Sequence, residues 1–520
     1  MPCNLARLTP AQSTIPLKPK YFVRRTLIPS LICLAIFVAI PAFAASDPVA
    51  ALAKIEPHFA STIAFGGNSE ALIILNEQAD LSGAANLATK LQKGTYVYNA
   101  LKGAAERSQA PLRKMLQERG IPFQSFFSVN MIKVNASRDQ IYEIAGRDEV
   151  LRIEANPYIK SPIPGPSGTL STVQQSQGVG VSTAVATPGT IEWNVQRVNA
   201  PQAWALGFNG QGMVVAGADT GVMWNHAALI NHYRGWNGTT ANHSYSWHDA
   251  TSARSLTPVD PQYHGTFTMS EMVGDDGVGN QVGVAPGAKW IACRNMDQHG
   301  VGSPSQYIEC FDWIIAPYPM GQPQLANPAM APDAVNNSWD CPTSEGCNLT
   351  TLVAAVTAVQ AAGIFESMAA GNYGSACSTV ETTPAIFANS VSVGATDSYN
   401  SIAPFSSRGP VTVDLSNRLK PEIVAPGLNI RGAIAYTTTS YQNYWSGTSM
   451  AAPHVAGAVA ILWQAKPNLI GNIPLTLQYL TQNATQYTST QTCGSFHGTS
   501  IPNAVFGYGL LNILKSVQAP

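Results

Sequence analysis

At positions 447–457 the chain reads Gly447-Thr448-Ser449-Met450-Ala451-Ala452-Pro453-His454-Val455-Ala456-Gly457. Gly447 permits a tight turn, and Ser449 is expected to begin a helix of small residues that runs to Trp463. Pro453 fits only near a helix start, because it has no N–H to donate. The segment therefore predicts that the Ser449 hydroxyl lies at a helix N-terminus, where backbone N–H groups favour an oxyanion. Serine is also a common N-cap, so this segment alone leaves a structural role open.

Two shorter motifs precede this segment. In Val214-Val215-Ala216-Gly217-Ala218-Asp219-Thr220-Gly221, an apolar strand ends in a carboxylate and a turn. His264-Gly265-Thr266 precedes a helix-compatible stretch. A DTG motif also occurs in aspartic proteases, but that chemistry needs two carboxylates that share a proton, and the chain has no second DTG or DSG. The chain order Asp219, His264, Ser449 is instead one of the known orders of a Ser-His-Asp triad.

With these three motifs the chain resembles the subtilisin-like serine proteases (subtilases, peptidase family S8), most closely members like bacillopeptidase F. The resemblance covers residues 192–519. Further matching segments are GVAPGA at 283–288, VNNSW at 335–339, FSSRG at 405–409, KPEIVAPG at 420–427 and FGYG at 506–509. The resemblance implies a serine endopeptidase that hydrolyses peptide bonds through an acyl-enzyme.

The resemblance also implies a role for each site residue. Ser449 is the nucleophile, His264 is the general base, and Asp219 orients His264. The backbone N–H of Ser449 and the side chain of Asn372 form the oxyanion hole. An extended substrate adds as a strand between two segments, one formed by Gly300, Val301 and Gly302, the other by Asn337, Ser338, Trp339 and Asp340.

Two residues depart from the family pattern. Phe267 stands where many subtilases have a second histidine, which raises a question about the packing near His264. Asp340 stands where the family usually has glycine. A carboxylate beside the primary pocket is a reason to expect a preference for Lys or Arg there, and the alternative is that Asp340 points to solvent.

Hydrophobic patterning predicts an α/β domain from residue 191 to residue 520. Short apolar runs alternate with glycine-rich loops and helical stretches such as 351–362, which is typical of buried parallel strands. The runs lie at 213–218, 290–293, 334–338, 364–369 and 391–393. We therefore expect a three-layer subtilisin-like domain with a mostly parallel central sheet.

Residues 45–160 are predicted to form a separate, small α+β unit. Strands are expected at 71–75, 126–134 and 150–153, with helices at 94–118 and 137–145, the latter capped by Ser137. This order fits a ferredoxin-like unit. The resemblance implies an inhibitory propeptide of the inhibitor I9 type. Residues 161–190, rich in Ser, Pro and Gly, are interpreted as a linker that contains the processing site.

The N-terminus has the pattern of a secretory signal peptide. Basic residues precede an apolar run at 27–40, and Ala42-Phe43-Ala44 is a small-x-small cleavage site, so residues 1–44 are predicted to be removed. The alternative is a membrane anchor, but the run is shorter than the roughly 20 residues that span a bilayer. We expect a secreted protein without a stable membrane anchor, extracellular or periplasmic.

Composition restricts the partners and cofactors. The net charge is −1, from 29 basic and 30 acidic residues, which gives no reason to expect nucleic acid as a partner. The expected partners are protein or peptide substrates and the chain's own propeptide, and the family resemblance implies a monomer. The chemistry requires no cofactor. Structural calcium is a family property, and the loop with Asp275-Asp276-Gly277 offers oxygen ligands, although no metal site is assigned.

Cysteines and histidines leave alternatives open. Six cysteines follow the signal and allow 15 pairings: Cys293, Cys310, Cys341, Cys347, Cys377 and Cys493. Cys341 and Cys347 are the first pair expected, and free buried thiols are the alternative. A second group contains His226, His232, His243 and His248, which raises the alternative of a metal-dependent hydrolase, although the spacing matches no zinc motif. The remaining alternative is an inactive subtilase-like binding module.

Overall fold

The computed structural model describes residues 48–161 and 190–520. The predicted signal peptide (1–44) and almost all of the predicted linker (161–190), with its processing site, lie outside the described residues. Within the described ranges, no helix is both long and apolar enough to cross a bilayer.

The first described range contains a four-stranded antiparallel sheet. Its order is β2-β3-β1-β4, and the helices α3 and α4 fall in the chain order β-α-β-β-α-β, which is the expected ferredoxin-like fold. The elements are α1 (Pro48–Ala53), α2 (Pro57–Ile63), β1 (Asn68–Leu75), α3 (Lys90–Glu118), β2 (Phe123–Phe126), β3 (Met131–Ser137), α4 (Arg138–Ala145) and β4 (Val150–Ala155).

Local signals explain most of these elements, with one correction. Ser137 caps α4 through a capping box with Gln140, as its position before the helix predicts. The prediction of one strand over 126–134 is wrong, because a turn at 127–130 divides this stretch between β2 and β3. The turn carries few turn-forming signals of its own, and its N–H groups at Phe127 and Ser128 bond to a side chain far away in the sequence.

The second range contains a seven-stranded sheet in which every strand pair is parallel. The strand order is β15-β14-β13-β12-β7-β10-β8. The five apolar runs all form strands, and the two short edge strands were not predicted from hydrophobicity. The strands are β7 (Val214–Asp219), β8 (Trp247–Asp249), β10 (Lys289–Arg294), β12 (Ala334–Asn337), β13 (Phe365–Ala369), β14 (Val391–Thr396) and β15 (Ile423–Pro426).

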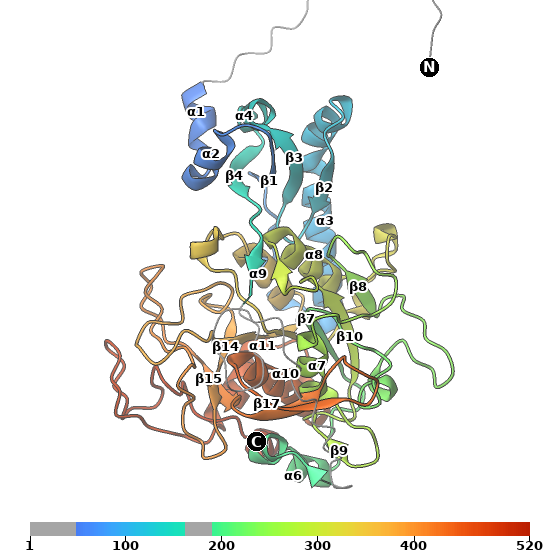
Figure 1. The fold of residues 1–520 in the computed structure, drawn as a ribbon, viewed down its shortest axis with the longest axis vertical. Helices are drawn as coiled ribbons and strands as arrows, with labels where there is room; N and C mark the ends of the chain where they lie inside the picture. Colours follow the sequence, from blue (N-terminus) through green and yellow to red (C-terminus); the bar gives the residue numbers. More distant parts are fainter. Residues whose placement is uncertain (1–47, 162–189) are drawn as a thin grey trace, which may run out of the picture. The chain divides into compact units, whose positions relative to one another are not determined.

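Helices cover both faces of this sheet, which confirms the three-layer α/β fold (Figure 1). On one face, α7 (His264–Val273) and the central α10 (Thr448–Ala465) share a core with side chains such as Val215. On the other face, α8 (Pro304–Ile315) and α9 (Val353–Ala361) pack over Ala216 and Ile291. Burial on both faces is the reason that the strands are continuous apolar runs.

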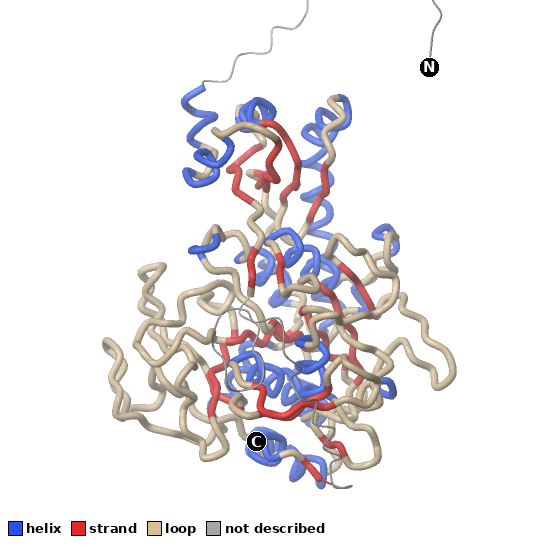
Figure 2. Tube along the Cα trace, viewed as in Figure 1, coloured by secondary structure: helices blue, strands red, loops and turns tan. Residues whose placement is uncertain are grey.

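Shorter helices and strands, coloured blue and red in Figure 2, complete the fold together with disulfides. The short helices are α5 (Trp193–Arg197), α6 (Ala200–Ala205), α11 (Ile473–Gln482) and α12 (Ile513–Gln518). The two-stranded pairs are β5 (Ile159–Lys160) with β11 (Val301–Gly302), β6 (Thr190–Ile191) with β9 (Asn280–Gln281), and β16 (Ile430–Ala433) with β17 (Tyr441–Trp445). The expected disulfide Cys341–Cys347 is present, together with Cys293–Cys310 and Cys377–Cys493.

Strand β13 carries a buried carboxyl group, that of Glu366. The residue is 3% exposed, and neither carboxyl oxygen has a hydrogen-bond partner within 48–161 and 190–520. Burial raises the pKa of Glu366 well above its ordinary value. The unfolded chain keeps the ordinary pKa, so it releases this proton at a lower pH than the folded chain does.

This difference predicts a stability that falls with pH. The contribution of Glu366 is complete below its unfolded pKa, and each pKa unit of difference costs about 1.4 kcal/mol once pH has risen through the folded pKa. In a Ser449→Ala background, which removes the nucleophile expected from the sequence, Glu366→Gln is expected to flatten the decline of Tm between pH 5 and pH 9. The exposed Glu381→Gln is the control. Equal slopes for Glu366→Gln and its parent would contradict the assignment.

Candidate active site

Three adjacent strands bring the functional segments to one edge of the sheet. β13, β12 and β7 are neighbours and run parallel, so their carboxyl ends meet at the same edge. β7 ends at Asp219, β12 ends just before Ser338, and β13 ends three residues before Asn372. Residues separated by more than 150 positions therefore lie at one site.

Asp219 and His264 form a buried pair. His264 is the first residue of α7, and its Nδ1 lies 2.8 Å from Asp219 Oδ1. Asp219 also accepts hydrogen bonds from Thr220 N–H at 2.7 Å and from the Thr268 hydroxyl at 3.2 Å. A carboxylate beside Nδ1 keeps the proton on that nitrogen, which leaves Nε2 as an acceptor. Among the described residues, nothing hydrogen-bonds to His264 Nε2.

A second buried carboxylate, Asp260, joins the loops that carry this pair. Its Oδ1 accepts from the Thr220 hydroxyl at 2.8 Å, and its Oδ2 accepts from the Thr266 hydroxyl and N–H, both at 2.7 Å. The two loops also approach closely at Gly265, where a Cβ atom would lie 2.1 Å from the Gly221 oxygen. Sequence reasoning missed Asp260, because nothing in its polar loop distinguishes it from an ordinary turn residue.

Ser449 lies in the first turn of α10, which begins one residue earlier than predicted and ends at Ala465. Pro453 has no N–H, so it leaves the Ser449 carbonyl without its helical partner. The Ser338 hydroxyl donates to that carbonyl at 2.9 Å, and the Ser449 hydroxyl donates to the Ser338 carbonyl at 3.4 Å. These bonds fix the start of the helix against the segment after β12.

Asn372 is oriented by the residue that precedes Ser449. The N–H and the hydroxyl of Thr448 both donate to Asn372 Oδ1, at 2.8 and 3.0 Å. Since two donors hold the oxygen, the amide nitrogen points the other way and is available as a donor. Gly371 precedes it with a φ of +106°, and its N–H donates to Thr448 Oγ1 at 3.1 Å. Sequence reasoning did not identify this role of Thr448.

Ser449 and Asn372 line one small cavity together with parts of both strand ends. The other lining residues are Ser161, Ser338, Trp339, Asp340, Ala369, Gly371 and Thr448. The alternative that Asp340 points to solvent is wrong, because Asp340 is only 7% exposed and lies on the cavity wall. Asn337 is fully buried at the end of β12 and does not line this cavity.

The segment with Gly300, Val301 and Gly302 forms an edge that already has a partner. Residues Val301 and Gly302 constitute β11, which pairs antiparallel with β5, and Gly300 O accepts from Ser161 N–H at 3.2 Å. Across the site, Trp339 stacks on Tyr307 with ring centroids 4.0 Å apart. The two predicted substrate-binding segments therefore flank the end of the first described range.

Phe267 packs beside His264 as half of an aromatic pair. Its ring stacks on Trp445 with centroids 4.6 Å apart, and the Trp445 ring lies 6.2 Å from that of His264. Both aromatic residues are buried. Trp445 of β17 therefore packs against the apolar ring of Phe267. This contact shows how a phenylalanine is accommodated near His264.

The four histidines do not form one group. His226 Nε2 contacts Ser440 O, His232 Nε2 contacts Asp275 O, His243 Nδ1 contacts Tyr233 Oη, and His248 Nε2 contacts Glu309 Oε1. In the part of the chain that the structure describes, no three His, Cys, Asp or Glu side chains are placed to hold a metal ion. The carboxylates of Asp275 and Asp276 accept N–H groups of their own loop.

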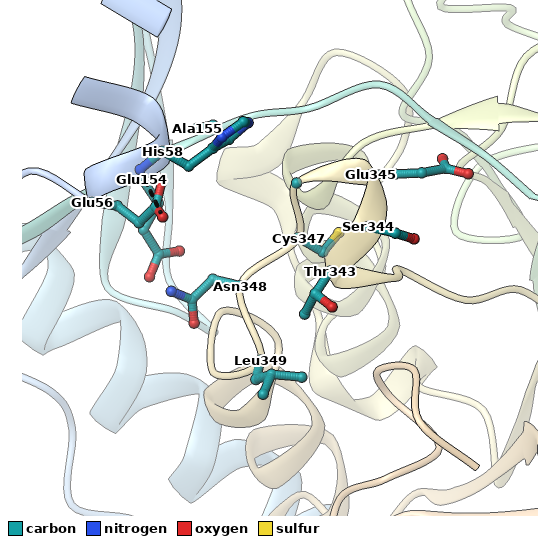
Figure 3. A pocket seen from close by; sticks show the side chains of 11 residues that line it. Glu56, His58, Glu154, Ala155, Thr343, Ser344, Glu345, Cys347, Asn348 and Leu349 are labelled. Atoms are coloured by element: carbon teal, nitrogen blue, oxygen red, sulfur yellow. Dashed lines mark hydrogen bonds between the residues drawn. The ribbon is translucent and has the colours of Figure 1, made fainter. Parts of the chain in front are cut away.

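A cavity of about 530 Å³ lies away from Ser449, between residues of the first range and the loop after Cys341 (Figure 3). Its carboxylates have structural partners. Glu56 caps α2 through the N–H groups of His58 and Phe59, and Glu154 accepts from Arg152 and Thr351.

Comparison with known proteins gives consistent matches. A family model described as the subtilase family matches residues 210–509. Bacillopeptidase F of Bacillus subtilis (strain 168) is 36% identical over 450 residues, which covers 83% of this chain and 29% of that protein. Subtilisin Savinase of Lederbergia lenta is 30% identical over 311 residues, covering 59% of this chain and 96% of that protein. The chain thus spans less than a third of the length of bacillopeptidase F.

Proposed function

Because the chain belongs to the subtilase family, peptidase family S8, we propose that it is a secreted serine endopeptidase made as a self-inhibited pre-pro-enzyme. The observation that carries the proposal is the buried Asp219–His264 pair at 2.8 Å, beside a helix whose Ser449 shares a cavity with Asn372. These groups supply the nucleophile, the base and the oxyanion donor that hydrolysis of a peptide bond requires.

The mechanism follows from the positions of the protons. Ser449 Oγ turns from the Ser338 carbonyl to His264 Nε2, the unpartnered acceptor, and attacks the peptide carbonyl carbon while His264 takes its proton. Catalytic hydrogen bonds are often absent before substrate binds. Asp219 stabilises the imidazolium. His264 then donates the proton to the leaving amine, the acyl-enzyme forms, and a water molecule repeats the sequence to release the acid.

Charge on the tetrahedral intermediate has two donors. The N–H of Ser449 lies in the first turn of α10, where helical N–H groups have no intrahelical acceptor. The Asn372 amide is preset by Thr448, so it needs no reorganisation when the oxyanion forms. Preset donors contribute more than donors that must first be ordered.

The contacts of β5 support inhibition by the propeptide. β5 pairs antiparallel with β11, the edge on which an extended substrate is expected to add, and Ser161 lines the cavity of Ser449. Lys160 N–H also donates to Glu345 at 2.8 Å. A substrate therefore competes with this segment for the same backbone groups, and cleavage in 161–190 with dissociation of the propeptide opens the edge.

Contacts remote from Ser449 add to the affinity of the propeptide. Asp312 of α8 accepts the N–H of Phe127 at 3.0 Å and the N–H of Ser128 at 2.8 Å. Lys90 pairs with Asp333 at 2.7 Å. The sheet face that carries Leu72 shares an apolar core with α8 and α9. The two bonds to Asp312 hold the turn that separates β2 from β3, which gives that turn its reason to form.

Labelling with a serine-directed fluorophosphonate tests the enzyme assignment. The processed protein is expected to carry one label, on the peptide that contains Ser449, and to hydrolyse casein. The reagent needs an activated serine, so heat-denatured protein and a Ser449→Ala variant are the controls. An intact, folded protein that takes no label would support the inactive binding module instead.

Sequencing of the N-terminus tests the precursor assignment. Cells that express the whole chain are expected to export a protein whose first residue lies within 161–190. A mature N-terminus well inside 47–150 would contradict the division into propeptide and peptidase. The signal peptide, the absence of a membrane anchor and the monomeric state remain predictions that fractionation and light scattering of the same sample address.

A further inference from the structure

The residue whose carbonyl is attacked must place its side chain in the cavity beside Ser449. Its carbonyl carbon lies at Ser449 Oγ and its oxygen lies near Asn372 during the reaction. The cavity lined by both residues is therefore the space next to its Cα atom. One wall is the segment 338–340 after β12, and the other is the segment 369–372 at the end of β13.

Asp340 lies on the wall of this cavity, and only one of its two carboxylate oxygens accepts a hydrogen bond among the described residues. Its Oδ2 accepts a hydrogen bond from the hydroxyl of Tyr373, which belongs to the opposite wall. Its buried Oδ1 has no hydrogen-bond partner among the described residues. A buried carboxylate oxygen without a donor is costly, and a ligand that brings a donor removes the cost.

No cation of the described chain compensates Asp340, which forms no ion pair within 48–161 and 190–520. The charged groups that act on it or on its partner Tyr373 are acidic, namely Glu345 and Glu381. Burial raises the pKa of Asp340 to about 6, and two hydroxyls oppose this shift. That of Tyr373 donates to Oδ2, whereas that of Thr382 lies close to the carboxylate but makes no hydrogen bond among the described residues. Above that pH the cavity holds one uncompensated negative charge.

The covalent frame around the carboxylate is rigid. The next residue, Cys341, is bonded to Cys347, and its N–H donates to Thr383 O at 2.8 Å. On the opposite side, the N–H of Tyr373 donates to Ser407 Oγ at 3.1 Å, and the loop that follows is bonded to Cys493 through Cys377. A fixed carboxylate retains its position when a substrate enters, and such preorganisation favours selection by charge.

We propose that Asp340 is the counter-ion for a lysine or arginine side chain at the residue before the cleaved bond, so that the enzyme cleaves substrates after basic residues in preference to neutral ones. The inference rests on the proposed function and names its substrate class. An ammonium or guanidinium group supplies both the missing donor and the missing positive charge. A neutral side chain of the same length supplies no positive charge. When it binds, the Asp340 carboxylate loses water without gaining a counter-ion, which weakens binding.

Matched fluorogenic amides test the proposal on the processed enzyme. Four peptides differ only at the residue before the reporter: arginine, its neutral isostere citrulline, lysine and leucine. Wild type is expected to show a kcat/KM for arginine on the order of 10²-fold above that for citrulline at pH 8. In Asp340→Asn this ratio is expected to fall to near 1. In the control Asp414→Asn, which changes an exposed carboxylate that pairs with Arg418, it is expected to stay at the wild-type value.

A wild-type pH series tests the same charge without any variant. The ratio of arginine to citrulline hydrolysis is expected to rise as pH increases through about 6, because Asp340 ionises there and the other groups affect both substrates equally. A ratio near 1 at every pH overturns the proposal. Failure of the proposed function is a different result, since it removes hydrolysis of all four peptides and fluorophosphonate labelling together.

Discussion

Ser449→Ala is expected to lower kcat for peptide hydrolysis by about 10⁶-fold, the magnitude known for the nucleophile of a subtilisin. Alanine has no atom that can form the acyl-enzyme, so only the oxyanion donors and substrate binding remain. His264→Ala is expected to have an effect of similar size, because an unassisted serine is a weak nucleophile. The double variant should be no slower than either single one, since the two residues act in one step.

The measurement combines amide hydrolysis with the size of the exported protein. Ser375→Ala replaces an exposed serine on the loop after Asn372 and is the matched control. If the Ser449→Ala protein stays long while the control is trimmed, the chain processes itself. If the variant is trimmed and inert, another protease matures it and the catalytic assignment stands. Equal hydrolysis by wild type and Ser449→Ala would remove Ser449 from the mechanism.

Asn372→Ala is expected to reduce kcat by about 10²–10³-fold with little change in KM, a size that comes from a subtilisin. The amide donates to an oxygen that becomes negative only during the reaction, so the substrate complex loses little. Both Thr448 groups would lose their acceptor at the same time, because they bond to Asn372 Oδ1. Fluorophosphonate labelling should slow as well, since the phosphorylated serine also develops an oxyanion.

A second variant separates the donor from its orientation. Thr448→Val keeps the Asn372 amide and the N–H bond to its oxygen. It removes the hydroxyl, which donates to Asn372 Oδ1 at 3.0 Å and accepts the Gly371 N–H at 3.1 Å. We expect a smaller loss of kcat, on the order of 10-fold, because one of two orienting donors remains. A loss below 10-fold in Asn372→Ala would assign oxyanion stabilisation to backbone groups alone.

Signals carried by a few consecutive residues explain the strands and helices that the sequence motifs predicted. The proposed catalytic segments, at 214–221, 264–266 and 447–457, and the buried strands carry local signals, namely apolar runs, turns and a helix start. The structure forms a strand or a helix at each of them. The expected bond between Cys341 and Cys347 was likewise found because both cysteines lie in one short loop.

Such local signals did not predict the contacts between segments that lie far apart in the chain. The stretch 126–134 has the pattern of a single strand. The hydrogen bonds that the N–H groups of Phe127 and Ser128 donate to Asp312 explain why a turn forms within it. Asp260 and Thr448 look like ordinary loop residues until the fold places them against Thr220 and Asn372. None of these pairings is encoded near either partner in the chain.

The sequence alone therefore indicated the family and the three-layer fold, and it supplied the residues that are proposed to carry the chemistry, because each depends on a few consecutive positions. It left Asp340 undecided between a pocket and solvent. That choice depended on β12 and β13 being neighbours, which puts Tyr373 opposite Asp340 and closes the cavity around one unpaired oxygen. Burial and unmet hydrogen bonds are properties of an assembled surface, so they emerge only when strands far apart in sequence meet.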